Sequence, residues 1–197
     1  MKTFEMAKLR KGLAVAILPL AFIGCKSDGK SSDTSTSKAD ASTTKTGKLF
    51  EDCFKQKQAG DTVAATACFT KVIKQNPTDE GKLTTYANYN LGVIAQEGGD
   101  TASAIQFYNR TLALSPTYQS AQFNLAVALT AEHPDQALEY YNKILAVNPD
   151  DANALFNAGL IEYQQLANPV AGKDMIAKAI RIAPSLELKI PAGVDIG

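Results

Sequence analysis

One pattern occurs four times in this chain of 197 residues, at an interval of about 34 residues. Each copy is a run of alternating aliphatic and polar residues, and each run ends in a proline. The four prolines are Pro77, Pro116, Pro149 and Pro184, which are 39, 33 and 35 residues apart. A repeat of this length predicts an array of small supersecondary units, each of which packs only on its neighbours. Such arrays present extended surfaces and usually carry no catalytic centre.

Two positions recur before each proline. A small residue lies twelve positions before it, at Ala65, Ala104, Ala137 and Gly172. A bulky residue lies eight positions before it, at Phe69, Tyr108, Tyr141 and Ile176. Residues four apart share one face of an α-helix, so each unit should contain a helix that presents these two residues together.

A second motif precedes the first in every unit. It occupies residues 89–92, 123–126 and 156–159, with a weaker version at residues 50–53. Turn signals separate the two motifs at residues 59–61, 98–100 and 133–135, where glycine or proline ends one helix and aspartate can cap the next. Each unit is therefore predicted to be a helix–turn–helix hairpin.

These motifs resemble the tetratricopeptide repeat family over residues 49–184. The resemblance implies an all-α fold, a right-handed superhelical solenoid of about four hairpins, at residues 48–79, 85–118, 119–151 and 152–185, followed by a tail at 186–197. The fourth unit departs from the family pattern at Gly172 and Ile176. The first has polar Asp52 and Gln56 where the family has large apolar residues. An N-terminal capping repeat would account for this, and a decayed repeat is the alternative.

The first 47 residues have a different composition. A basic start is followed by an apolar run at residues 13–23 and then by Gly24-Cys25, which resembles a bacterial lipoprotein signal with the lipidated residue at Cys25. An ordinary secretory signal is the alternative. We therefore expect a signal peptide at 1–24 and a disordered tether rich in Ser, Thr and Lys at 25–47. The protein would be exported and lipid-anchored, facing the periplasm or the cell exterior. Lys26 favours the outer membrane if the cell has two.

Charge and composition exclude several function classes. The signal carries four basic residues and one acidic residue, so the remainder has 16 Lys and Arg against 19 Asp and Glu, with no basic cluster to attract nucleic acid. His133 is the only histidine and stands in a turn, where we expect it to be solvated. No phosphate-binding glycine loop or metal-ligand spacing is present. We expect no enzyme activity, no metal and no cofactor.

In members of the family that bind peptides, the first helices of the hairpins line a concave groove, where a recurring asparagine bonds the ligand backbone. The resemblance places twelve residues of this chain there: Phe50, Phe54, Tyr86, Tyr89, Asn90, Val93, Phe123, Asn124, Val127, Phe156, Asn157 and Leu160. The positions that hold cations in carboxylate-binding relatives are neutral here, which favours a partly apolar partner segment. The alternative is that the asparagines serve local structure.

Two function classes remain open. The first is a membrane-anchored scaffold or assembly factor that binds an extended, partly apolar peptide segment of a protein partner. The second is a transport accessory lipoprotein that binds a small apolar solute. A fold does not decide between them.

Cys53 and Cys68 are the two cysteines that remain after Cys25. They lie on either side of the turn at residues 60–61 and nearly equidistant from it, so they should sit at one level of the first hairpin. Cys53 also occupies the small-residue position at which the helices of the family approach most closely. We predict a disulfide between them, because an exported chain leaves the reducing cytosol. Two buried free thiols are the alternative.

Overall fold

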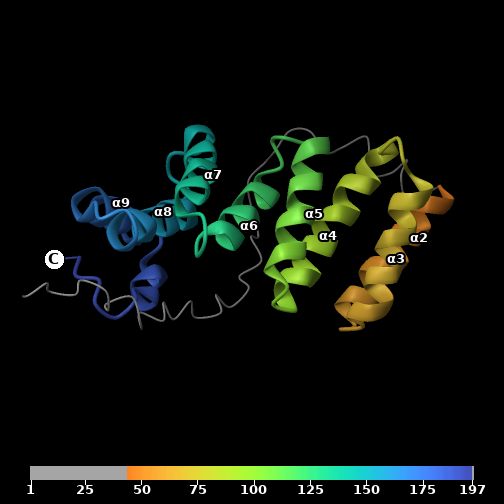
Figure 1. Cartoon of the computed structure of the whole chain (residues 1–197), viewed down its shortest axis with the longest axis horizontal. Coiled ribbons are helices and arrows are strands. Elements are labelled where there is room, and N and C mark those ends of the chain that lie inside the picture. Colours follow the sequence, from red (N-terminus) through yellow and green to blue (C-terminus); the bar gives the residue numbers. More distant parts are fainter. Residues whose placement is uncertain (1–43, 197) are drawn as a thin grey trace, which may run out of the picture. The chain divides into compact units, whose positions relative to one another are not determined.

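The protein's computed structural model describes residues 44–196, and within this range the chain forms eight α-helices, two 3-10 helices and no strand (Figure 1). The α-helices are α2 (Lys45–Gln58), α3 (Thr62–Gln75), α4 (Leu83–Glu97), α5 (Thr101–Leu114), α6 (Gln119–Leu129), α7 (Pro134–Val147), α8 (Ala152–Gln164) and α9 (Pro169–Ile182). The 3-10 helices are η1 (Glu80–Lys82) and η2 (Pro184–Lys189). The predicted signal peptide, Cys25 and most of the predicted tether lie outside the described residues.

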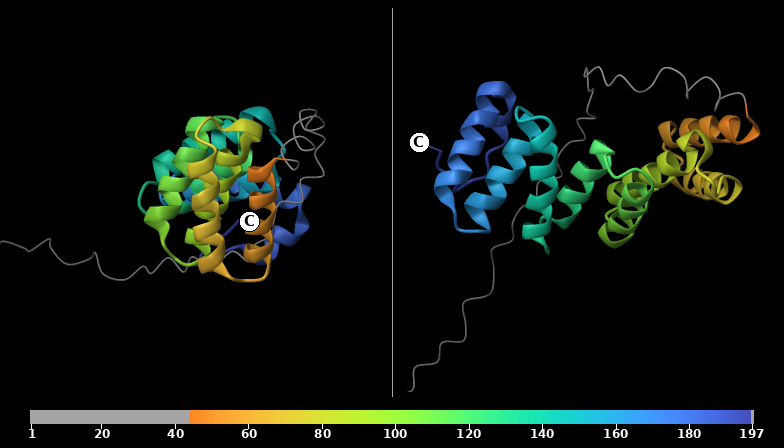
Figure 2. Two further views of the ribbon diagram at one scale, coloured as in Figure 1. Left: turned by 90° about the vertical axis from the view of Figure 1, so that its right-hand side faces the viewer. Right: turned by 90° about the horizontal axis from the view of Figure 1, so that it is seen from above.

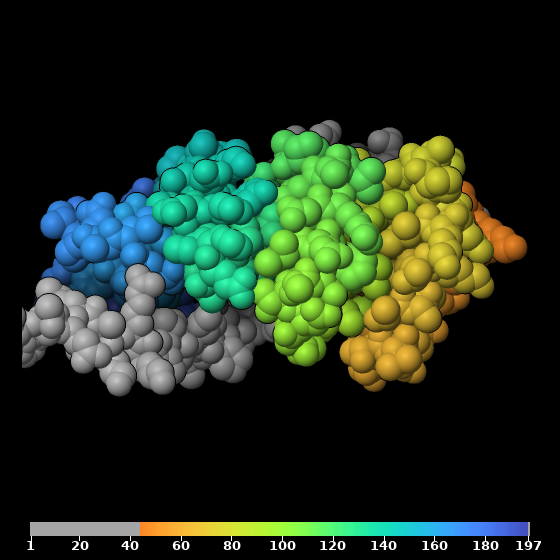
Figure 3. Space-filling model, in the orientation of Figure 1, coloured from red at the N-terminus to blue at the C-terminus, as the bar shows by residue number. Residues whose placement is uncertain are grey.

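Consecutive helices pair into four hairpins, α2–α3, α4–α5, α6–α7 and α8–α9. The second helix of each hairpin also contacts the first helix of the next, so the hairpins stack in chain order (Figures 1 and 2). In the space-filling view, α3, α5 and α7 form successive bands on the visible face (Figure 3). The predicted all-α solenoid of four hairpins is confirmed.

The first helix begins earlier than the sequence predicted. Lys45, Thr46 and Gly47 were assigned to the tether, but they form the first turn of α2. The reason is the residue before them. Thr44 is the N-cap, and its side chain accepts a hydrogen bond of 2.9 Å from the backbone N–H of Gly47, which satisfies a donor that the helix leaves free.

The turn signals act as predicted in two hairpins but not in the third. Asp61 accepts from the backbone N–H of Ala64 at 2.9 Å, and Asp100 accepts from that of Ser103 at 3.0 Å. Asp135 was expected to cap α7 in the same way, and this prediction is wrong. Because Pro134 takes the first helical position, the N-cap is His133, which is exposed and makes no side-chain cap, and Asp135 falls in the first turn.

The longer spacing between the first two units is taken up by η1. Asp79, Gly81 and Lys82 adopt positive φ there, which bends the chain sharply between α3 and α4. Asp79 replaces the missing N-cap of α4, since its carboxylate accepts from the backbone N–H of Thr85 at 2.8 Å and also from the Thr85 hydroxyl. The extra residues therefore change the linker without interrupting the stack.

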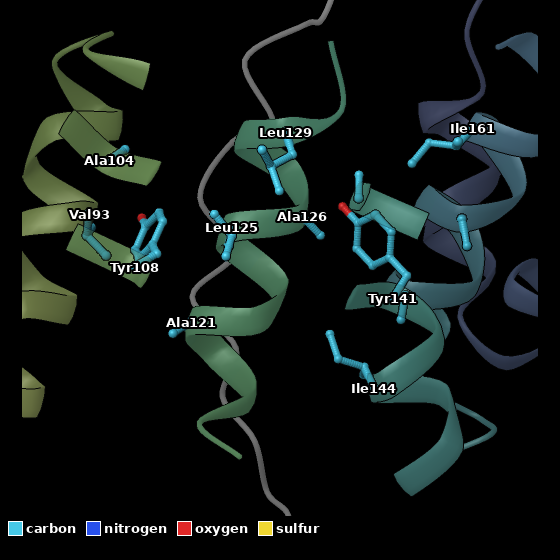
Figure 4. Packing of buried hydrophobic residues seen from close by; sticks show 13 residues of the cluster. Val93, Ala104, Tyr108, Ala121, Leu125, Ala126, Leu129, Tyr141, Ile144 and Ile161 are labelled. Carbon is cyan, nitrogen blue, oxygen red and sulfur yellow. The ribbon is translucent and has the colours of Figure 1, made fainter. Parts of the chain in front are cut away.

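The predicted small and bulky positions form the contacts between helices. Ala65, Ala104 and Ala137 are fully buried, and so are all four bulky residues, Phe69, Tyr108, Tyr141 and Ile176. Figure 4 shows the largest cluster, in which Tyr108 and Tyr141 lie on either side of α6 and its Leu125 and Ala126. Each bulky residue thus fills the space between its own hairpin and a neighbouring helix.

Two glycines explain the unusual fourth unit. A Cβ atom built on Gly172 would lie 2.7 Å from the backbone oxygen of Gly159, and one built on Gly159 would lie 2.9 Å from the oxygen of Gly172. No real side chain tolerates such distances, so α8 and α9 approach at this point more closely than any pair with an alanine could. The replacement of the usual alanine by Gly172 is therefore a requirement of close packing rather than a loss of the pattern.

Cys53 and Cys68 are joined by a disulfide that links α2 to α3, with their Cα atoms 5.2 Å apart. Cys53 is fully buried, and it belongs to the same apolar cluster as Ala65 and Phe69. The bond closes a loop with a sequence separation of 15 residues. It therefore fastens the first hairpin, which has a neighbour on one side only.

We predict that Cys53 and Cys68 take up no thiol reagent in denaturant until a reductant is added. Reduction should lower the free energy of unfolding by about 3 kcal/mol, because a loop of this length regains its chain entropy in the unfolded state. Denaturant titrations with and without reductant measure the difference. Two reactive thiols in the untreated protein would contradict the prediction.

Candidate functional site

The first helices of the first three hairpins lie next to one another, since α2 contacts α4 and α4 contacts α6. We call the surface contributed by α2, α4, α6 and α8 the first-helix face. All twelve predicted groove residues lie on these four helices. The face is therefore the one to which the sequence assigned binding, and the question is which of its side chains a ligand can reach.

The twelve residues differ in exposure. Phe54 is the most open, with 41% of its surface exposed. The half-buried residues are Phe50, Tyr86, Tyr89, Phe123, Asn124, Val127, Asn157 and Leu160. The prediction of accessibility is wrong for Asn90, Val93 and Phe156, which are buried. Val93 belongs to the central apolar cluster and Phe156 to the cluster at the other end of the array, so neither is open to a ligand here.

The aromatic residues form a continuous series of ring contacts. The ring centroids of Phe50 and Tyr86 are 6.3 Å apart, those of Tyr86 and Tyr118 are 6.0 Å apart, and those of Tyr118 and Tyr89 are 5.1 Å apart. These are ordinary distances for tilted and edge-to-face pairs. The series runs from the first hairpin to the start of the third. We call these four residues the aromatic series.

Tyr118 was missed by the sequence prediction. It is the N-cap residue of α6. The equivalent position in the fourth hairpin, the N-cap of α8, holds Asp151. Because the family motif lies further along each first helix, an N-cap tyrosine carries no signal in the repeat. Its position directly after the Pro116 turn is the only feature that could have indicated it.

The asparagines mostly serve local structure. The Nδ2 group of Asn90 donates to the backbone oxygen of Tyr86 at 2.8 Å, and that of Asn157 donates to the backbone oxygen of Asn153 at 2.9 Å. Asn124 differs, because its Nδ2 group donates across to the Tyr89 hydroxyl at 3.3 Å. The three recurring asparagines are therefore not equivalent, although the resemblance gave them one role. Asn124 is the one that is tied to the aromatic series.

A cation also lies on this face. The Nζ atom of Lys57, on α2, donates to the Oδ1 atom of Asn90 at 3.1 Å. Burial lowers the pKa of Lys57, and the nearby Glu97 carboxylate partly opposes this effect. The sequence prediction of a face without cations considered only the positions of the family's carboxylate-binding residues. Lys57 lies nearly one turn beyond Phe54 on α2, and so it was missed.

Two tyrosines next to the face, Tyr108 on α5 and Tyr118 at the N-cap of α6, are neutral hydrogen-bonding groups. Burial, with a smaller contribution from Tyr89, raises the pKa of Tyr108 and of Tyr118 well above the usual value. The Tyr108 hydroxyl donates to the Oε1 atom of Gln96 at 2.6 Å. Phenols that stay protonated can stack and hydrogen-bond but cannot act as bases near neutral pH.

Residues 44–196 offer no group of three or more histidines, cysteines or carboxylates that could hold a metal ion. In the same part of the chain, no helix combines the length and the apolar character needed to cross a membrane. The side chains singled out on the first-helix face are aromatic rings, amides and the half-buried Lys57.

Comparison with known proteins agrees with the architecture. The family described as tetratricopeptide repeat matches residues 56–118 and 120–187, which is more than half of the chain. A stretch of 55 residues is 34% identical to the photosystem I assembly protein Ycf3 of Rippkaea orientalis. That match covers 28% of this chain and 30% of Ycf3, so the likeness spans less than a third of the curated relative.

Three solved structures have a similar fold. A tetratricopeptide repeat protein from Parabacteroides merdae has a TM-score of 0.64 and 24% identity, and the likeness covers 71% of this chain and 54% of that one. MamA from Desulfovibrio magneticus has a TM-score of 0.64 and 20% identity, covering 72% and 77%. YrrB, described as having an unusual peptide-binding site, has a TM-score of 0.60 and 20% identity, covering 73% and 72%. At these identities the likeness shows the fold alone.

We predict that Asn90→Ala lowers the free energy of unfolding by about 1 kcal/mol, because the half-buried Lys57 ammonium loses its acceptor. Asn157→Ala is the matched control. Its side chain bonds the backbone of its own helix, and alanine has the higher helix propensity, so its effect should stay within about 0.5 kcal/mol of zero. Denaturant titrations of both variants measure the difference. Equal effects would show that Lys57 gains nothing from Asn90.

Proposed function

The chain belongs to the tetratricopeptide repeat family, and from that premise we propose that it is a membrane-anchored scaffold or assembly factor outside the cytoplasm. Its first-helix face binds an extended, partly apolar segment of a protein partner. The repeats provide the scaffold, and the predicted lipid on Cys25 provides the anchor. The protein acts by holding its partner and not by catalysis.

The observation that carries this proposal is the aromatic series. Phe50, Tyr86, Tyr89 and Tyr118 are half-buried, so each ring is held by its neighbours and still presents part of its surface. Rings held in this way lose little conformational freedom when a ligand covers them, and aromatic residues dominate the energetics of many interfaces. Phe54 extends the apolar surface along α2, where 41% of its area is exposed.

The polar groups on the face suit a peptide. A peptide segment brings one N–H and one C=O per residue, and both need partners when water is excluded. The tyrosine hydroxyls and Asn124 can supply them between the rings. Lys57 supplies a cationic donor at the α2 end, which favours a partner segment with an acceptor or acidic residue there. This adds an acceptor to the partly apolar partner segment that the sequence alone favoured.

The anchor rests on the sequence, since residues 1–43 lie outside the described part of the chain. It is supported by the basic start, the short apolar run and the Gly24-Cys25 pair. An assembly role is supported by the partial likeness to Ycf3, which is described as an assembly protein. Binding of a peptide is supported by the fold shared with YrrB.

We predict that Phe54→Ala weakens partner binding at least tenfold and leaves the melting temperature nearly unchanged, because this ring is exposed on the first-helix face. Val63→Ala is the matched control, since Val63 is 81% exposed but lies on α3. The partner would first be captured from detergent-solubilised membranes, and its affinity for each purified variant would then be measured. Equal binding by both variants would contradict the proposal. A retained apolar solute in native mass spectrometry, with no protein partner, would favour the transport accessory.

We predict that Cys25→Ser abolishes lipidation and leaves the repeats folded, because the thiol of Cys25 would carry the lipid. Incorporation of labelled fatty acid by the variant and by the wild type measures this, and circular dichroism checks the fold. Ser27→Ala provides a control substitution two residues away. Wild-type levels of label in Cys25→Ser would overturn the anchor.

A further inference from the structure

The fourth hairpin differs from the others on the first-helix face. Phe50, Tyr89, Phe123 and Phe156 occupy the same position in the four units, and the first three are half-buried. Phe156 is only 3% exposed. The difference is not due to a following hairpin, because α9 is followed by η2 and then by residues 190–196. Something else within the described chain covers Phe156.

Residues 190–196 contribute to that cover, together with Ile176 of α9 and Leu186 of η2, which are buried in the same apolar cluster. Val194 is 9% exposed and belongs to the same apolar cluster as Phe156 and Leu186. Partly buried side chains from α8 and from the segment pack against this cluster. They include Leu160 and Tyr163 from α8, and Ile190 and Ile196 from the segment. Phe156 and Leu160 are two of the residues predicted to bind a peptide. The segment therefore contacts the part of the face to which ligand binding was assigned.

A turn directs the segment onto the face. The backbone N–H of Val194 donates to the oxygen of Pro191 at 3.2 Å, and Gly193 adopts a φ of 91° at the third position of this turn. A positive φ at that position is the mark of a type II turn and favours glycine. The turn brings Val194 back toward α8. In the left view of Figure 2, η2 lies on the same side of the array as α2, which forms the first-hairpin end of the first-helix face.

The polar contacts resemble those of a bound peptide. The backbone N–H of Asp195 donates to the Tyr163 hydroxyl at 3.4 Å, so a first-helix side chain bonds a main-chain group of the segment. The carboxylate of Asp195 also lies 3.7 Å from the Nζ atom of Lys173, at the start of α9. Tyr163 stands at the position that Lys57 occupies in the first hairpin, six residues after the motif's second residue.

We propose that residues 190–196 are an intramolecular ligand of the first-helix face. They occupy its fourth-hairpin end, and a partner segment of the same chemistry binds there only after they leave. That chemistry is an aliphatic segment with a turn and an acidic residue. The inference rests on the proposed function and adds a partner class and a means of regulation to it. A tethered segment competes at an effective concentration on the order of millimolar, which excludes weak free ligands.

The segment is suited to reversible release. Its ion pair is exposed, with 83% of the Asp195 side chain accessible, so it contributes little to holding the segment down. The other attachments include the hydrogen bond from Asp195 to Tyr163 and the apolar contacts of the cluster that contains Val194. Such a segment can detach by local opening while the four hairpins stay folded.

The test uses a fluorescent peptide with the sequence of residues 190–197. We expect it to bind the Val194→Asp protein, and the protein lacking 190–197, at least tenfold more tightly than it binds the wild type. Leu188→Asp is the matched control, because Leu188 is 91% exposed in the neighbouring η2, and this variant should behave as the wild type. A peptide that carries aspartate in place of its valine should bind none of the proteins.

Two results would overturn the inference. One is the absence of peptide binding to both released proteins, and the other is equal binding to released and wild-type protein. Circular dichroism must show wild-type helix content in at least one released protein. If neither is folded, hydrogen exchange on the wild type decides, because saturating peptide should accelerate exchange at 194–196 by displacing them, and unchanged exchange would overturn the inference.

The outcome is separable from that of the proposed function. The peptide assay needs no natural partner and reports on α8, whereas Phe54 lies on α2 at the other end of the face. Partner binding that depends on Phe54, together with a failed peptide assay, would overturn only the intramolecular ligand. A successful peptide assay without any protein partner would leave the segment as a ligand and remove the scaffold function.

Discussion

Close packing of one bulky side chain against small residues of neighbouring helices is the interaction on which the other features depend. Tyr108 illustrates it. Its ring is fully buried, and a Cβ atom on Gly92 of the adjacent helix would lie 2.6 Å from the ring. A single hairpin has no core of its own, so this contact joins two helices and the next hairpin at once. Because the contact recurs in each unit, the first helices become neighbours and together form one face.

The repeat pattern reveals only what the units share. The hairpins, the small and bulky positions and the caps at Asp61 and Asp100 could be predicted because each follows from a residue's own helix or turn. The burial of Phe156 and the roles of Tyr118 and Lys57 could not be predicted. Each depends on a contact that occurs in one unit only. The early start of α2 was missed because a single N-cap, Thr44, outweighs the tether-like composition of the next three residues.

The two terminal hairpins are stabilised in different ways. A terminal hairpin has a single neighbour, so one of its faces would remain uncovered. The first hairpin has polar residues on its outer helix and a disulfide between Cys53 and Cys68. The last hairpin has its closest helix contact at Gly159 and Gly172, and it is covered by η2 and residues 190–196.

The first-helix face is open in one part and covered in another. Its rings are partly open in the first three hairpins, where the aromatic series runs from Phe50 to Tyr118, and covered in the fourth, where the segment around Val194 contacts α8. A partner that binds only the open part meets rings, Asn124 and Lys57, and need not disturb the segment. A longer partner must displace it, and its affinity is reduced by the free energy that holds the segment in place. Under the proposed function, the face discriminates between partners by length as well as by chemistry, although its repeats are alike in fold.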